Sequence, residues 1–184
     1  VKNLLIILIY INIKKQVKLG GAYVLLSQGT PFLNGGQEFM RTKKGNPDSY
    51  SADTKGGIKW TNEPGKYNID DVNTIDLSMK ESYKDVFNTY KALIQIRKDI
   101  NAFTKGNYVE AITYKSTDGV IKYKTYDSKN TEYVVYFNGT DSDIECTDSG
   151  NIFSIDETNG TYKIADDSAR VGTLPAKSFI ILKK

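Results

Sequence analysis

The sequence predicts an α+β fold in which a helical first half is followed by an antiparallel β-sandwich. Apolar side chains recur at the three- and four-residue spacing of a helix after Ser78. After residue 103 the sequence pattern changes to short strand-like runs separated by turn residues. With 184 residues, 39% of them hydrophobic and 26% charged, the chain has an ordinary globular composition and enough sequence for a core.

Residues 1–16 differ from the rest of the chain. Lys2 precedes a run of apolar residues at 4–11, and Lys14 and Lys15 follow it. This run is far shorter than the ~20 residues that a membrane-spanning helix needs. No small-residue cleavage site of the kind that ends a signal peptide follows it. Three interpretations stay open: a weak export signal, a buried strand, or sequence foreign to the parent gene.

The next segment predicts a helix, a strand and a long loop in that order. Residues 17–27 carry apolar side chains at positions compatible with a mostly buried helix. Residues 30–33 form a short apolar run, which predicts a strand. Residues 34–72 are rich in Gly, Asn, Asp, Lys and Ser, which predicts a loop. Loops longer than ~12–15 residues are mostly functional or disordered, so a site is expected here.

A second helix is expected to begin after Ser78. Ser78 and Glu81 have the spacing of a capping box, in which the hydroxyl and the carboxylate satisfy the first free N–H groups of a helix. The apolar residues that follow indicate an amphipathic helix of about twenty residues.

The remainder of the chain has the pattern of an all-β domain. The predicted strands are residues 108–114, 120–127, 132–138, 151–155, 161–165 and 178–182. Asn138-Gly139 and Asn159-Gly160 fit the glycosylation pattern, but Asn-Gly is also the favoured dipeptide of tight hairpin turns, and turn chemistry explains both.

Composition excludes several kinds of site. The chain contains no His, which removes His-dependent triads, His-ligated zinc and imidazole acid/base catalysis. The single Cys146 excludes an internal disulfide and a Cys-rich metal site. A net charge of +3 without a long basic run gives no indication of nucleic-acid binding. Asp141, Asp143 and Glu145 could together hold Ca²⁺, although they lack EF-hand spacing and an acidic solvated edge is the preferred interpretation.

The most informative segment is residues 27–41, Ser-Gln-Gly-Thr-Pro-Phe-Leu-Asn-Gly-Gly-Gln-Glu-Phe-Met-Arg. A short strand that runs into a glycine-rich polar loop is how α/β enzymes build the mouth of a pocket. The segment resembles the last barrel strand of the α-amylase superfamily of glycoside hydrolases. Its continuation, Arg-Thr-Lys-Lys-Gly-Asn-Pro-Asp-Ser-Tyr at 41–50, is similar to the type I pullulanases. The resemblance spans residues 17–103 and fades in the tail.

The resemblance implies that residues 17–103 are a remnant of the last β/α unit of a TIM barrel and that residues 104–184 form a C-terminal β-sandwich domain. The atypical segment 1–16 stands apart from both. The resemblance places three residues near the rim of a sugar-binding cleft: Asn34, Glu38 and Arg41. It places four more at loop positions that shape sugar subsites: Asp48, Ser49, Tyr50 and Asn73.

Physical chemistry is consistent with sugar binding by such residues. Planar amide, carboxylate and guanidinium groups hydrogen-bond paired hydroxyls, and Tyr50 or Trp60 could stack on a sugar ring. Two structural alternatives remain: an ion pair between Glu38 and Arg41, and burial of Trp60. The chain also departs from the pullulanase pattern at Leu77, where an aromatic residue is usual.

The implied activity is hydrolysis of α-1,6-glucosidic bonds in pullulan, starch or glycogen. A retaining glycosidase uses two carboxyl groups ~5–5.5 Å apart, carried on different barrel strands, and this chain holds one barrel-like strand. We therefore expect no catalytic residue, no metal and no cofactor in this chain, and no activity from the chain alone. The expected partners are an α-glucan and the missing N-terminal part of the barrel, with no nucleic acid and no clear membrane span.

Two other functions remain open. A non-catalytic carbohydrate-binding β-sandwich would be supported by an exposed row of aromatic side chains among Tyr108, Tyr114, Tyr123, Tyr126 and Tyr136. A non-functional gene remnant would be poorly soluble. The sequence does not determine the localisation, although a cytoplasmic location is favoured over secretion.

Overall fold

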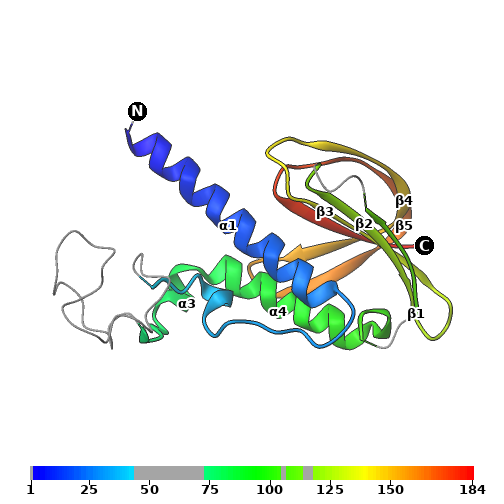
Figure 1. Ribbon diagram of the computed structural model, residues 1–184, viewed down its shortest axis with the longest axis horizontal. Helices are drawn as coiled ribbons and strands as arrows, with labels where there is room; N and C mark the ends of the chain where they lie inside the picture. The colour runs from blue at the N-terminus through cyan, green and yellow to red at the C-terminus, as the bar shows by residue number, and fades with distance from the viewer. Residues whose placement is uncertain (1, 44–72, 105–106, 114–117) are drawn as a thin grey trace.

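Two helices, α1 (Lys2–Leu26) and α4 (Lys84–Asp99), lie against one face of an antiparallel sheet in the computed structural model (Figure 1). The structure describes residues 2–43, 73–104, 107–113 and 118–184, and the side chains of residues 2–5 and 107–113 are outside that description. The remaining elements are η1 (Gln37–Phe39), α3 (Met79–Ser82), η3 (Asn101–Phe103), β1 (Asn107–Thr113), β2 (Val120–Tyr126), β3 (Glu132–Asn138), β4 (Ile144–Asp156), β5 (Thr161–Leu174) and β6 (Ser178–Lys183).

Residues 2–26 form the single helix α1. The helix predicted at 17–27 is therefore confirmed, and the alternative that residues 1–16 form a buried strand is wrong. The C-terminal part of α1 buries Ala22, Leu25 and Leu26, whereas its N-terminal part projects from the body of the molecule (Figure 1). A helix satisfies its backbone groups within one segment, so the projecting part needs no neighbouring strand. Among the described helices, none combines the length and the apolar character needed to cross a bilayer.

Helix α4 runs parallel to α1 and buries Val86, Leu93 and Ile96 against it and the sheet. The helix expected after Ser78 is present but is interrupted at Tyr83, between α3 and α4.

The predicted capping box is wrong. The Ser78 hydroxyl and amide both donate to Asp76 Oδ1, at 2.6 and 2.9 Å. Ser78 itself has helical angles, φ −65° and ψ −25°, whereas an N-cap residue that bonds the first N–H groups is normally extended. The Asp76 carboxylate therefore takes the Ser78 backbone N–H, which in a capping box would donate to the side chain of Glu81.

The strand predicted at residues 30–33 is also wrong. These residues are irregular and pair with no strand of the described sheet. A short apolar run becomes a strand through ladder hydrogen bonds to a neighbour, and Pro31 can donate none.

The sheet holds six antiparallel strands in the order β1-β2-β3-β6-β4-β5. Each predicted run falls on one of these strands, and β4 and β5 are longer than predicted. Along β3, Tyr133, Val135 and Phe137 face the helices, whereas Val134 and Tyr136 face away from them. The second face holds a smaller core with residues of β4, β5 and β6. The expected sandwich thus takes the form of one hydrogen-bonded sheet that curves over a second core (Figure 1).

The turn between β4 and β5 binds both helices. Asn88 of α4 donates its amide to the carbonyl oxygens of Glu157 and Thr158, at 2.9 and 2.6 Å. Lys18 of α1 pairs with the Glu157 carboxylate at 2.7 Å. Gly160 has a φ of 68°, which confirms the turn predicted at Asn159-Gly160.

Asn138-Gly139, by contrast, is not a tight hairpin turn. Five residues, 139–143, join β3 to β4. The Asn138 amide is buried and donates to the carbonyl oxygens of Ser142, Leu174 and Pro175, at 2.9, 3.2 and 3.0 Å. These bonds tie the start of this connection to Ser142 and to the segment between β5 and β6.

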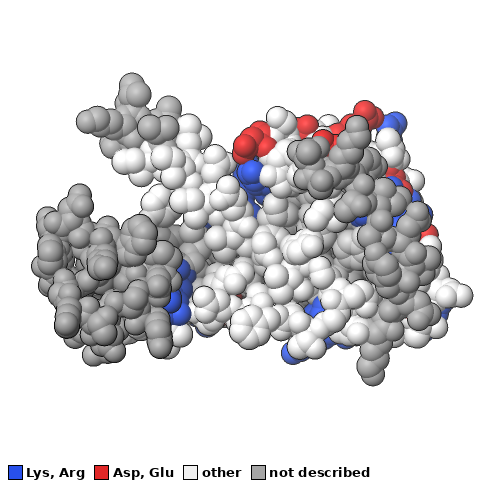
Figure 2. Space-filling model, in the orientation of Figure 1, with Lys and Arg blue, Asp and Glu red and all other residues white. Residues whose placement is uncertain are grey.

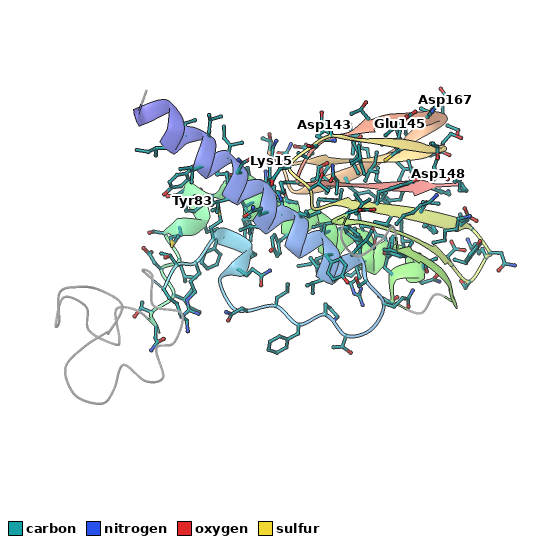
Figure 3. The ribbon with its side chains drawn as sticks, turned by 45° about the horizontal axis from the view of Figure 1, so that its top comes forward. Lys15, Tyr83, Asp143, Glu145, Asp148 and Asp167 are labelled. Carbon is teal, nitrogen blue, oxygen red and sulfur yellow. The ribbon has the colours of Figure 1, made fainter. Side chains whose placement is uncertain are left out.

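A charged network lies on the sheet face that points away from the helices. Asp148 of β4, which Figure 3 labels, accepts hydrogen bonds from Lys122 at 2.5 Å, from Lys184 at 3.1 Å and from the Tyr136 hydroxyl. Burial alone would raise the pKa of Asp148, but these bonds hold it well below its ordinary value. Burial would likewise lower the pKa of Lys122, and the bond to Asp148 raises it instead.

Candidate functional site

The polar loop after residue 33 is a compact turn held by its own backbone. The N–H of Gln37 donates to the carbonyl of Asn34 at 3.0 Å, and the N–H of Arg41 returns to the carbonyl of Gly36 at 2.9 Å. Gly36 and Met40, on either side of η1, have positive φ angles of 90° and 61°. A residue with a side chain rarely adopts such angles, so Gly36 is required where the chain reverses.

Arg41 ties this loop to a segment more than thirty residues away. Its guanidinium donates to the carbonyl of Asn73 at 2.5 Å and to that of Gly35 at 3.4 Å. Its Nε is buried without a partner among the described residues. A Cβ on Gly36 would lie 2.7 Å from the Arg41 Cβ, so the glycine also makes room for this side chain. The structure therefore brings Arg41 and Asn73 together.

Glu38 and Asn34 face a different side of the loop. Both line a groove of about 490 Å³ between the loop and α4, whose floor includes Leu33, Phe87 and Ile94. Arg41 instead lines a groove of about 590 Å³ formed with residues 74–79. Among the described residues, Glu38 and Arg41 are not paired with each other, so the alternative of a structural ion pair is wrong. The terminal nitrogens of Arg41 donate to backbone carbonyls instead.

Three predicted site residues, Asp48, Ser49 and Tyr50, lie outside the described residues, and so does Trp60. Of the predicted site residues, the structure describes Asn34, Glu38, Arg41 and Asn73. Asn34 and Glu38 line one groove and Arg41 lines the other, and Asn73 is bonded to Arg41 through its backbone carbonyl.

Tyr90 supports the loop from below and was not singled out by the sequence. Its hydroxyl accepts a hydrogen bond from Gln37 Nε2 at 2.9 Å and donates to the carbonyl of Val17 at 3.0 Å. Gly21 of α1 admits the ring, because a Cβ there would lie 2.3 Å from Tyr90 Cζ. Burial raises the pKa of Tyr90, so its hydroxyl stays protonated at neutral pH. In the sequence, Tyr90 is one more member of the apolar stripe of a helix.

A second support lies where α1 ends. Arg97 of α4 is buried and donates to the carbonyls of Leu25 at 2.7 Å and Ser27 at 2.8 Å, and also to that of Gly29. These are orphan carbonyls at and just beyond the helix C-terminus, where a cation is favoured. Burial lowers the pKa of Arg97, yet a guanidinium remains charged in proteins. The cation fixes the segment that leads into the candidate loop.

The sheet joins this support through two further side chains. The Tyr123 hydroxyl donates to the carbonyl of Leu26. Gln28 donates to the carbonyl of Ala102 at 2.5 Å and to the Thr125 hydroxyl at 3.1 Å. The loop entrance is thus fixed by groups from both α4 and β2.

The acidic segment after β3 forms no metal cluster. Asp141 pairs with Lys177 at 3.1 Å, and Glu145 pairs with Arg170 at 2.8 Å. Asp143 accepts the backbone N–H of residue 176 at 2.9 Å. Acidic side chains lie along this edge of the sheet in the space-filling view (Figure 2), and Figure 3 shows that Asp143 and Glu145 point outward. In the part of the chain that the structure describes, no group of three carboxylate or thiol side chains could hold a metal ion.

Of the tyrosines whose exposure would support a carbohydrate-binding sandwich, those with described side chains form no exposed row. Tyr123 and Tyr136 are buried, on opposite faces of the sheet. Tyr126 is half-buried, and the side chains of Tyr108 and Tyr114 are outside the described residues. The alternative of a carbohydrate-binding sandwich therefore gains no support from these residues.

Comparison with known proteins gives one consistent result. A pullulanase of Bacillus subtilis (strain 168) is 30% identical over 120 residues, which cover 62% of this chain and 14% of that relative. The solved structure of a pullulanase from Bacillus acidopullulyticus matches with a TM-score of 0.65 and 26% identity. The chain is similar to pullulanases. This match covers 93% of the chain and 20% of the solved structure, so the chain spans a small part of each relative.

A third match concerns the fold alone. The product complex of SpuA, a multi-modular glycogen-degrading pneumococcal virulence factor, matches with a TM-score of 0.62 and 20% identity, covering 94% of this chain and 22% of that one. No sequence-family profile matches the chain. Because these matches cover nearly the whole chain, the helices and the sheet are found together in the solved pullulanase.

Proposed function

We propose that this chain is the C-terminal part of a pullulanase-like glycoside hydrolase that cleaves α-1,6-glucosidic bonds in pullulan, starch or glycogen. One observation carries the proposal: the likeness to a solved pullulanase covers 93% of this chain but 20% of that structure. In this proposal residues 17–103 are the end of the catalytic barrel, residues 104–184 are the C-terminal β-sandwich domain, and the catalytic carboxylates lie elsewhere in the enzyme.

Exposed apolar side chains support a partner that covers them. Phe32, just before the candidate loop, is 89% exposed, and Leu77, in the segment 74–79 that lines the Arg41 groove, is 70% exposed. The projecting part of α1 exposes apolar side chains at Ile6, Ile7, Leu8, Ile9, Tyr10, Ile11 and Ile13. A helix that is apolar all round is normally buried within a larger protein. The N-terminal part of the barrel is the partner we propose for these surfaces.

The proposed sugar contacts follow from the two grooves. Asn34 and Glu38 present an amide and a carboxylate at the edge of the groove beside α4, where both could bond sugar hydroxyls. Arg41 holds Asn73 in place rather than reaching outward. Asp48, Ser49 and Tyr50 would complete the subsites.

The activity is tested by incubating the purified chain with pullulan and measuring the reducing ends released. We expect no release above the background, because the chain carries one segment of the barrel. Turnover that a single carboxylate substitution abolishes would contradict the proposed division of the enzyme.

The sugar contacts are tested by electrophoresis of the chain through gels that contain pullulan. We expect pullulan to retard the unmodified chain, and Asn34→Ala or Glu38→Ala to reduce this retardation. Asp167→Ala provides a matched control, because Asp167 lies on the far edge of the sheet (Figure 3). Equal retardation of all four proteins would exclude Asn34 and Glu38 as sugar contacts.

A further inference from the structure

Three Asn-Gly dipeptides occur in this chain, at residues 34, 138 and 159. In such a pair the backbone nitrogen of Gly can attack the Asn side-chain carbon Cγ, form a five-membered succinimide and expel ammonia. One water molecule then opens either ring bond, which leaves aspartate or isoaspartate. The reaction consumes one water, releases one ammonia and needs no enzyme or oxidant. Its rate depends on whether the fold restrains the amide and the attacking nitrogen.

The fold restrains both groups at Asn138. The side chain is fully buried, and its Nδ2 donates to three carbonyl oxygens. Its Oδ1 accepts from the Thr140 amide at 3.0 Å and from the Thr140 hydroxyl at 2.7 Å. The attacking nitrogen of Gly139 donates to the carbonyl of Gly119 at 2.8 Å. Ring closure here requires local opening of the sheet.

Asn159 is exposed but is also restrained. Its Nδ2 donates to Asp156 Oδ2 at 2.8 Å. The attacking nitrogen of Gly160 donates to the carbonyl of Asp156 at 2.8 Å, and Gly160 is held at a φ of 68°. Both reacting groups are therefore anchored to one residue of the β4–β5 turn.

Asn34 differs from the other two. Its side chain is exposed, and among the described residues it makes no hydrogen bond through its amide. The nitrogen of Gly35 has no hydrogen-bond partner among those residues either, and only the backbone carbonyl of Asn34 is engaged, by Gln37 at 3.0 Å. Gly35 has no positive φ that would fix its conformation.

We propose that Asn34 is a site of spontaneous deamidation, at which the folded protein converts to the aspartate and isoaspartate forms. The change adds a negative charge to the groove that Glu38 already lines. The isoaspartate form also adds a methylene to the backbone, immediately before the turn that Gly36 makes. This inference does not depend on the proposed function.

The test follows all three sites in one sample. The folded chain and the urea-unfolded chain are incubated at mildly alkaline pH, and peptides are quantified by mass spectrometry. Isoaspartate is detected with an enzyme that methylates isoaspartyl carboxylates. We expect Asn34 to convert at a similar rate in both samples, whereas Asn138 and Asn159 convert at least about tenfold more slowly in the folded one.

Gly35→Ala is the matched control, since a side chain on the following residue obstructs ring closure. The substitution fits the fold, because the new Cβ would lie 3.5 Å from Ile75 Cδ1, an ordinary contact. We expect it to slow the conversion of Asn34 several-fold without a change in the thermal midpoint. The proposal is wrong if Asn34 converts in the unfolded chain but stays intact in the folded one, or converts no faster than Asn138.

Discussion

Arg97→Ala tests the idea that one buried cation holds the entrance of the candidate loop. The substitution removes the donors to three carbonyl oxygens. Leu25 is buried, so its carbonyl finds no water, whereas Ser27 is half-buried and Gly29 is exposed. We assign about 2 kcal/mol to the first carbonyl and about 1 kcal/mol to each of the others, which gives about 4 kcal/mol in all. Domains of this size are stable by about 5–15 kcal/mol, so this loss would be roughly a quarter to four-fifths of the total.

The assay is equilibrium unfolding in urea, followed by circular dichroism. Arg97→Lys keeps the charge but cannot reach all three carbonyls with one ammonium group, so we expect it to lose about half as much stability. Arg170→Ala is the control, because its ion pair with Glu145 is exposed and contributes less than about 1 kcal/mol. If Arg97→Ala costs no more than Arg170→Ala, the proposed support is wrong.

Three further predictions concern other contacts. The folded-state pKa of Asp148 is depressed, so its contribution to stability is present above the unfolded pKa of about 3.9 and is lost as pH falls toward the folded pKa. Asp148→Asn should therefore reduce the loss of stability that acid causes. An unchanged acid limb of the stability–pH curve would contradict this. Gly36 has a φ of 90°, so Gly36→Ala should lower the free energy of unfolding in urea by about 1–3 kcal/mol. Gly35→Ala should leave it nearly unchanged, and equal effects of the two substitutions would refute the argument. Asn88→Ala should lower stability by about 1–3 kcal/mol by leaving two carbonyls of the β4–β5 turn unpaired, and faster amide exchange in that turn would locate the effect.

Periodicity alone predicts most of the secondary structure. The stripe that begins at Val86 depends on one repeating contact with a single core, so local pattern and tertiary burial agree. Strand β3 is buried on both faces, by two cores, and its apolar run between turn residues is what predicts it. The apolar run at residues 30–33 satisfied the same local criterion and failed. A strand needs a neighbour to pair with, and the pattern of one segment carries no information about that neighbour.

The candidate site was predicted less completely for a related reason. The sequence shows that Glu38 and Arg41 are close along the chain and carry opposite charges, which favours an ion pair. Gly36 instead leaves room for the Arg41 side chain, which donates to backbone carbonyls. Tyr90 and Arg97 were missed because their roles depend on carbonyl groups of distant residues, and every residue type has a carbonyl.

The contacts of the β4–β5 turn with both helices have a consequence for folding during synthesis. Glu157 is made some seventy residues after Asn88, yet it joins α4 to Lys18 of α1. A nascent chain that ends before this turn holds both helices without their common anchor. The packing of α1 against α4 should therefore gain further protection from proteolysis once this turn has left the ribosome.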